Sequence, residues 1–126
     1  MGGGKGRLLV VDDERAVLKV VSALLDHAGF QVKTAASGPE ALAWFDAHPT
    51  EVDAALLDLA MPEMDGAVLL RELRRRRPEL PIILTSGYAE QTAIDDFAAR
   101  DYQAFMRKPY RPRDLVEVLR SHLPER

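Results

Sequence analysis

Five side chains that could carry chemistry stand directly after short apolar segments of the sequence. They are three carboxylates, one hydroxyl and one ammonium group: Asp12, Asp13, Asp58, Ser86 and Lys108. Tens of residues separate the segments, so only the fold can bring these groups together. In an open parallel sheet the binding crevice lies outside the carboxyl ends of the strands, which is where such residues would meet.

If the three aspartates lie close together, their negative charges repel one another, and a bound cation would offset this repulsion. Two carboxylates about 4 Å apart repel each other by roughly 4 kcal/mol at an effective dielectric constant of about 20. Mg²⁺ fits the site because it prefers oxygen ligands and completes its shell with water and phosphoryl oxygens. We expect Asp13 and Asp58 to be direct ligands and Asp12 to act through water.

Asp58 is also a candidate nucleophile, because a carboxylate can attack phosphorus to form an aspartyl phosphate. Mg²⁺, Lys108 and the Ser86 hydroxyl would stabilise the charge on the transferred group, and no separate general base is required. A plainer interpretation is that Asp12 or Ser86 only caps the helix that follows it. That interpretation fits either residue taken alone, but it does not account for the whole set.

The elements that must position these residues alternate regularly between strand and helix. Apolar runs predict strands at 8–11, 30–34, 52–57, 81–84 and 104–106. Helical spacing of apolar residues predicts helices at 17–28, 39–45, 66–77, 93–98 and 115–123, with Gly29 ending the first and a Ser37–Glu40 capping box opening the second. Such alternation predicts an α/β fold with a five-stranded parallel sheet and helices on both faces.

Composition limits the classes of function. The chain has 126 residues, no cysteine and a formal net charge of −3, and 47% of its residues are hydrophobic, which suits one folded domain without disulfides. Apolar runs are far shorter than a membrane span, and the charge balance disfavours direct nucleic-acid binding. We expect a flexible lead-in or cloning remnant at 1–6, one domain at 7–124 and a tail at 125–126.

Four motifs resemble the receiver domain of two-component response regulators, and the resemblance covers residues 7–123. The motifs are Leu-Val-Val-Asp-Asp-Glu at 9–14, Asp-Leu-Ala-Met-Pro-Glu-Met-Asp-Gly at 58–66, Leu-Thr-Ser-Gly at 84–87 and Lys-Pro at 108–109. The resemblance implies a flavodoxin-like (βα)5 fold with the strand order 2-1-3-4-5. An acidic loop after the first strand distinguishes the chain from flavin-binding proteins of this topology, because it would repel the flavin phosphate.

The resemblance also implies roles for the acidic residues. Asp58 is the expected phosphoacceptor. Mg²⁺ or Mn²⁺ is expected to be bound by Asp12, Asp13, Asp58 and the backbone carbonyl of Ala60.

Residues near the ends of the fourth and fifth strands have implied roles as well. By resemblance, Ser86 is the switch hydroxyl, Lys108 pairs with the phosphoryl group, and the bond from Lys108 to Pro109 is cis. Phe105 matches the switch aromatic, whose rotamer follows Ser86. Tyr88 and the segment 101–103, which lacks the glycine common before the fifth strand, depart from the usual family pattern.

The implied function is a phosphorylation-dependent switch in the cytoplasm that is not a separate enzyme but assists its own phosphorylation and dephosphorylation. A sensor histidine kinase or a histidine phosphotransfer domain would supply the phosphoryl group. A downstream partner would bind the fourth helix, fifth strand and fifth helix, without direct nucleic-acid contact or membrane insertion. Alternatives are a receiver fragment of a hybrid histidine kinase, a degenerate receiver and, disfavoured by Ala60, an aspartyl-phosphate phosphatase.

Other features have plainer interpretations. The arginine cluster formed by Arg71 and Arg74 to Arg77 is expected to be a solvated helix end that complements the helix dipole. The isolated residues His27, His48 and His122 are expected at the surface, and Trp44 is expected to pack against the core.

Overall fold

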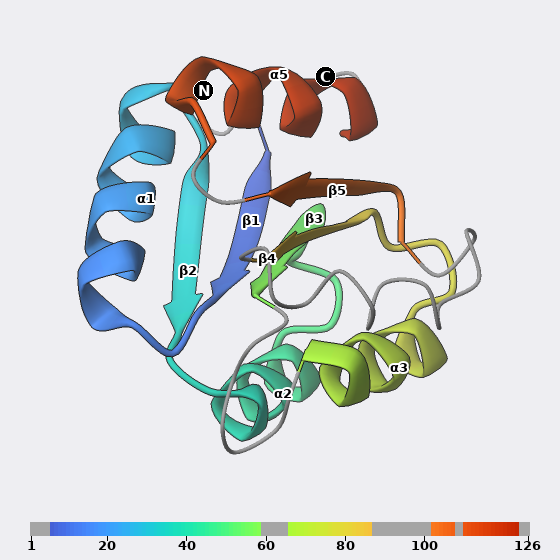
Figure 1. Cartoon of the computed structure of the whole chain (residues 1–126). Helices are drawn as coiled ribbons and strands as arrows, with labels where there is room; N and C mark the ends of the chain where they lie inside the picture. The colour runs from blue at the N-terminus through green and yellow to red at the C-terminus, as the bar shows by residue number, and fades with distance from the viewer. Residues whose placement is uncertain (1–5, 59–65, 87–101, 108–109, 124–126) are drawn as a thin grey trace.

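A computed structural model describes residues 6–58, 66–86, 102–107 and 110–123 (Figure 1). The elements in chain order are β1 (Arg7–Val11), α1 (Arg15–His27), β2 (Gln31–Ala35), α2 (Gly38–Ala47), β3 (Ala54–Asp58), α3 (Gly66–Arg76), β4 (Ile82–Ser86), β5 (Ala104–Arg107) and α5 (Pro112–His122). The five predicted strands and the first, second, third and fifth predicted helices are confirmed, with boundaries shifted by a few residues. The helix expected at 93–98 lies outside the described residues.

The five strands form one parallel sheet in the order β2-β1-β3-β4-β5, as the resemblance implied. β1 and β3 are central neighbours, and Val11 lies opposite Leu57 in their register. Asp12, the residue after β1, and Asp58, the last residue of β3, are therefore neighbours at the same edge. None of the described helices is long and apolar enough to cross a membrane.

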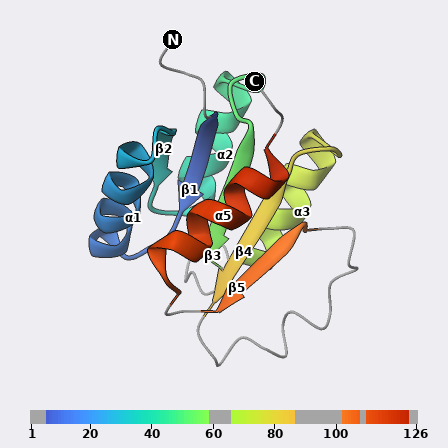
Figure 2. The same ribbon diagram turned by 90° about the horizontal axis from the view of Figure 1, so that it is seen from above.

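Two hydrophobic cores cover the two faces of the sheet. α1 and α5 pack on one face, whereas α2 and α3 pack on the other (Figures 1 and 2). Successive residues of β1 alternate between these cores: Leu9 and Val11 face α2 and α3, while Leu8 and Val10 face α1 and α5. Burial on both faces explains why the central strands are almost continuously apolar.

The end of α1 is set by Gly29. Its φ of 102° lies in the region that favours glycine. The Gly29 N–H donates to the Asp26 carbonyl at 3.0 Å, and the Phe30 N–H donates to the Leu25 carbonyl at 3.0 Å. This pair of bonds is the Schellman motif, in which a buried residue after the glycine commonly contacts the helix. Phe30 serves this cap, which is why β2 begins at Gln31 instead of Phe30.

Replacing Gly29 with alanine is expected to lower the free energy of unfolding by about 1–2 kcal/mol, because a Cβ is strained at this positive φ. Gly29→Asn should lose less, since asparagine tolerates positive φ better. Urea unfolding of both variants measures the effect. Equal stability of the parent protein and Gly29→Ala would contradict the assigned cap.

The start of α2 confirms the predicted capping pattern with one change. The Glu40 N–H donates to the Ser37 hydroxyl at 3.2 Å, as expected of an N-cap serine. The Glu40 carboxylate, however, accepts from the N–H of Ala36 at 3.1 Å, one residue before the position in the usual capping box. The reciprocal bond therefore reaches back into the turn that follows β2.

Gly6 takes part in the fold, although we assigned it to the lead-in. Its carbonyl accepts a hydrogen bond from the Gln31 N–H at 3.0 Å, and its φ is 114°. A Cβ at this position would meet Leu123 and Asp53 at 3.4–3.5 Å. The hydrogen bonding between β1 and β2 therefore begins at Gly6, before the first residue of the domain that the apolar pattern indicated.

Candidate functional site

The three predicted acidic residues meet at the carboxyl ends of β1 and β3. Each of Asp12, Asp13 and Asp58 offers a carboxylate oxygen, and these oxygens lie within 4.8 Å of one another. Asp12 and Asp58 are 4% and 5% exposed, so both are buried, whereas Asp13 is more accessible to solvent. Among the described residues this is the only group of three or more potential metal ligands.

Local backbone geometry orients Asp12. Its N–H continues the sheet by donating to the Ala35 carbonyl at 3.2 Å, and its Oδ1 accepts from the Glu14 N–H at 2.9 Å. Glu14, not Asp12, is the N-cap residue of α1, and its side chain makes no capping hydrogen bond. Asp12 is therefore not the N-cap residue itself, but its carboxylate satisfies the N–H of the N-cap residue.

The donor set fits a hard divalent cation. It consists only of carboxylate oxygens, which suit Mg²⁺ and Mn²⁺ and offer neither the thiolate nor the imidazole ligands that Zn²⁺ commonly takes. Two buried carboxylates beside a third also place like charges close together, and a bound cation would offset that repulsion. Asp13 is the most accessible of the three to solvent.

The strand ends on the other side of the site are described in part. β4 ends at Ser86 and β5 ends at Arg107, and these two residues are partners in the register. Thr85 is buried, and its hydroxyl donates to the Leu57 carbonyl at 3.4 Å, a long contact between β4 and β3 that the sequence did not indicate. The Ser86 side chain lies outside what the structure describes, as do Lys108, the Lys108–Pro109 bond and the Ala60 carbonyl.

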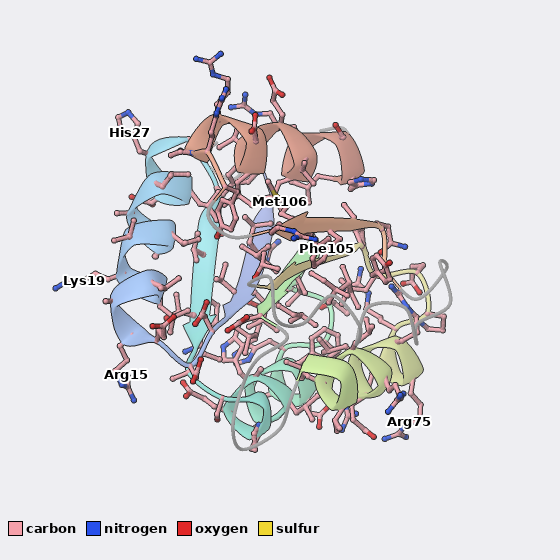
Figure 3. The ribbon with its side chains drawn as sticks, in the orientation of Figure 1. Arg15, Lys19, His27, Arg75, Phe105 and Met106 are labelled. Atoms are coloured by element: carbon pink, nitrogen blue, oxygen red, sulfur yellow. The ribbon has the colours of Figure 1, made fainter. Side chains whose placement is uncertain are left out.

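Phe105 lies on β5, opposite Leu84 of β4. Its half-buried ring packs against the core beneath α2 and α3, whereas Met106 packs against the core beneath α1 and α5. Figure 3 labels both side chains on the two sides of the strand. The Phe105 ring therefore contacts the core and is also partly exposed at the surface, a position compatible with the switch role that the resemblance implies.

The arginine cluster at the end of α3 differs from the solvated helix end that we expected. The Arg74 guanidinium donates to the carbonyls of Pro78 and Leu80 at 2.8 and 2.7 Å. Arg77 donates to the Val52 carbonyl, and only 25% of its side chain is exposed. Arg75 fits the expectation better, since 69% of its side chain is exposed and it extends from the helix (Figure 3).

Arg76 connects α3 with α2 through two carboxylates. Its Nε lies 2.7 Å from Asp46 Oδ1, and its Nη1 lies 2.7 Å from Glu72 Oε1. The hydrogen bond from Arg76 holds the pKa of Asp46 below its usual value of 3.8. Hydrogen bonds from Arg75 and Arg76 likewise lower the pKa of Glu72 from its usual 4.5.

These lowered pKa values predict a small loss of stability at acid pH. A carboxyl whose pKa is depressed in the folded state stabilises the fold above its unfolded pKa, and that contribution is lost as pH falls through the folded pKa. Urea midpoints of the parent and Asp46→Asn should therefore differ slightly at neutral pH and converge as the pH falls below 3.8 and through the lowered pKa of Asp46. Because Asp46 is exposed, 1 M salt should also shrink the difference. A difference that persists in acid would contradict the ion-pair assignment.

The histidines and the tryptophan lie apart from the acidic cluster. His48 stacks on Trp44 with ring centroids 4.6 Å apart, and its Nδ1 lies 3.0 Å from the Trp44 carbonyl. Trp44 is half-buried against the α2 and α3 core, as predicted. His27 is exposed, whereas His48 and His122 are half-buried, so the surface assignment is confirmed for His27 and only in part for the other two.

The sheet order and the acidic cluster at its carboxyl edge define a class of doubly wound α/β proteins whose site can hold a divalent cation. Comparison with known proteins gives the family. Residues 8–120 match the model of the response regulator receiver domain. The chain belongs to this family.

Curated relatives include a sensor kinase and a response regulator. The chain is 38% identical over 120 residues to sensor kinase CckA of Brucella abortus, covering 95% of this chain and 13% of that protein. It is 33% identical over 112 residues to response regulator SaeR of Staphylococcus aureus, covering 86% of this chain and 46% of that protein. The chain thus spans less than half the length of both relatives.

Solved structures agree with this fold. A receiver domain protein from Clostridium thermocellum superposes with a TM-score of 0.88 at 27% identity, covering 93% of each chain. A CheY-like receiver domain protein from Methanospirillum hungatei gives 0.84 at 32% identity, covering 92% of this chain and 91% of that one. The response regulator TrrA from Thermotoga maritima, in complex with Mg²⁺-BeF, gives 0.83 at 28% identity, covering 94% of this chain and 99% of that one.

Proposed function

We propose that this receiver domain is a Mg²⁺-dependent phosphorylation switch whose phosphoacceptor is Asp58. The observation that carries the proposal is the convergence of Asp12, Asp13 and Asp58, whose carboxylate oxygens lie within 4.8 Å at the carboxyl edge of the sheet. Asp58 ends the central strand β3 and lies between β1 and β4. It therefore stands where groups from both neighbouring strands can act on it.

In the proposed reaction a partner's phosphohistidine is the donor. An Asp58 carboxylate oxygen forms a bond to phosphorus while the nitrogen–phosphorus bond of the donor breaks. The electron pair of that bond stays on the imidazole nitrogen, which takes up a proton from solvent. The product is an acyl phosphate on Asp58, and its later attack by water releases inorganic phosphate and restores the carboxylate.

The surrounding residues have distinct parts in this proposal. Bound Mg²⁺ would supply positive charge that draws the phosphoryl oxygens to the acidic residues and offsets their repulsion. Asp12, Asp13 and Asp58 would hold the ion together with the Ala60 carbonyl. The Ser86 hydroxyl, from the last residue of β4, and the Lys108 ammonium group, which comes next after β5 in the sequence, would bind the phosphoryl oxygens.

The new charge would then alter a partner-binding surface. A phosphoryl group adds about 1.5 to 2 negative charges at neutral pH. We propose that Ser86 moves towards it, that Phe105 changes rotamer in response, and that the surface formed by the fourth helix, β5 and α5 changes affinity for a downstream partner. The half-buried packing of Phe105 supports this role because its ring contacts the core and still borders the surface.

Incubation with acetyl phosphate tests the proposed function. We expect intact mass spectrometry to show one added phosphoryl group in the presence of Mg²⁺ and none after chelation by EDTA. Fluoroberyllate should bind only with Mg²⁺ present, as its complex with the relative TrrA suggests. Phosphorylation that proceeds equally well in EDTA would contradict the metal assignment.

A phosphorelay step inside a hybrid kinase is a second candidate function. The 38% identity to the sensor kinase CckA favours it, although this chain corresponds to only 13% of that protein. In this case the phosphorylated domain would pass its phosphoryl group to a histidine phosphotransfer domain instead of changing the affinity of its own partner-binding surface. Rapid transfer from phosphorylated Asp58 to such a partner would support the relay.

We propose that residues 7–124 carry either function and that the domain acts in the cytoplasm.

A further inference from the structure

The start of β5 is tied to β4 by both the backbone and the side chain of Gln103. The Gln103 N–H donates to the Ile82 carbonyl at 2.8 Å. The Gln103 side-chain Oε1 accepts from the Ile82 N–H at 2.6 Å. The side chain thus takes the place of a backbone carbonyl and extends the ladder between the two strands by one further bond.

Arg74 links the same glutamine to α3. Its Nη2 lies 3.2 Å from Gln103 Oε1, while its Nη1 donates to the carbonyls of Pro78 and Leu80 in the turn between α3 and β4. Gln103 Oε1 therefore accepts two hydrogen bonds, one from a backbone amide and one from a charged guanidinium. Hydrogen bonds to charged groups are among the stronger ones in proteins.

β5 is the shorter of the two edge strands of the sheet. It has four residues, and Met106 is the only one of them that is buried. A short edge strand with little burial specifies its register weakly. A slip of one residue would move Phe105 and Met106 to the opposite faces of the sheet and would also displace the residue that follows Arg107.

We propose that Gln103, held by Arg74, is a positioning residue that sets the register of β5 and thereby places Phe105 and Lys108 for the phosphoryl group. This inference rests on the proposed function for the roles of those two residues. Gln103 immediately precedes β5, whereas the acidic residues lie at the carboxyl edge of the sheet. Gln103 would therefore act on that edge through the strand. It is not a residue that would touch the metal or the phosphoryl group.

Two ligands separate positioning from a general structural role. Mg²⁺ alone would be held by groups near β1 and β3, whereas fluoroberyllate with Mg²⁺ would also need Lys108 after β5. We expect Gln103→Met, which preserves length but removes the acceptor, to bind Mg²⁺ as the parent does and fluoroberyllate about tenfold more weakly. Gln103→Glu keeps the acceptor oxygens facing Ile82 and Arg74 and should bind fluoroberyllate within about twofold of the parent.

A matched control is Gln31→Met, the same change at the start of the opposite edge strand, β2. It should leave both affinities unchanged. Arg74→Met removes one of the two donors to Gln103 Oε1, together with the bonds to the carbonyls of Pro78 and Leu80. It leaves the bond from the Ile82 N–H to Gln103 in place, so it should weaken fluoroberyllate binding by a smaller factor and provides a second variant if Gln103→Met unfolds. Equal loss of both affinities, or no loss in either Gln103→Met or Arg74→Met, would overturn the proposal.

Hydrogen exchange tests the register directly in the protein without ligands. Gln103→Met should speed amide exchange in β5 by about tenfold relative to the parent while β1 and β3 keep their protection. Unchanged protection of β5 would overturn the inference whatever the ligands do. Failure of the parent to bind fluoroberyllate, with faster exchange in the variant, would instead reject the proposed function and retain the register constraint.

Discussion

Asp58→Asn is expected to reduce phosphorylation by acetyl phosphate at least ~100-fold, to the background of the assay. The amide preserves the size of the side chain, but it has no negatively charged oxygen to attack phosphorus. Asp58 is 5% exposed and ends the central strand β3, so a neutral side chain of the same shape should be accommodated. Intact mass spectrometry of parent and variant, treated side by side with Mg²⁺, measures the result.

Asp26→Asn is a matched control because it makes the same change on the exposed surface of α1. It should be phosphorylated like the parent. A second measurement follows Mg²⁺ through thermal unfolding. A ligand present at 100 times its dissociation constant stabilises the folded state by about 2.7 kcal/mol, and the variant should gain less because it lacks one carboxylate. If Asp58→Asn incorporates phosphate at the parent's rate, another residue is the acceptor.

Phe45→Ala should lower the free energy of unfolding by about 3–5 kcal/mol, the usual cost of removing a fully buried aromatic ring. Phe45 is 1% exposed and lies in the core between the sheet and the α2 and α3 layer. A domain of this size is commonly stable by only about 5–15 kcal/mol, so the variant is expected to be partly unfolded in mild denaturant. Urea unfolding followed by circular dichroism measures the difference.

Phe45→Leu is the conservative partner, since leucine refills much of the space, and its cost should be clearly smaller. Ala43→Gly, at an exposed position of the same helix, controls for helix propensity and should cost about 1 kcal/mol. Equal stability of Phe45→Ala and Phe45→Leu would contradict close packing around this ring. The folded fraction should still be phosphorylated, because Phe45 is a core residue and takes no part in the proposed chemistry.

The elements of the fold could be predicted from local patterns. Apolar runs marked the strands, and helical spacing marked the helices, because burial repeats with the period of each element. Gly29 was correctly expected to end α1, since a positive φ after a helix favours glycine at that position. Boundaries were less accurate: Phe30 was assigned to a strand, but it completes the cap of α1 through its bond to Leu25.

The strand order came from the family resemblance, because an alternating pattern predicts parallel strands but does not determine which strands are neighbours. The acidic site followed from the same reasoning, since residues after parallel strands meet at one edge. The arginines at the end of α3 were misjudged. Their sequence indicated only charge at a helix end, whereas Arg74 binds carbonyls of the turn that follows α3 and Arg77 binds the carbonyl of Val52.

Local sequence was therefore sufficient for the types of elements, the caps of α1 and α2, and the family motifs, because these depend on neighbours within a few residues. The close approach of Asp12 to Asp58, the contacts of the α3 arginines and the bond from Gln103 to Ile82 required the folded chain. Arg74 binds carbonyls four and six residues further along the chain, whereas the contacts Asp12–Asp58, Arg77–Val52 and Gln103–Ile82 join residues that are far apart in sequence. Such contacts arise from strand pairing and packing, which bring distant backbone and side-chain groups into one place.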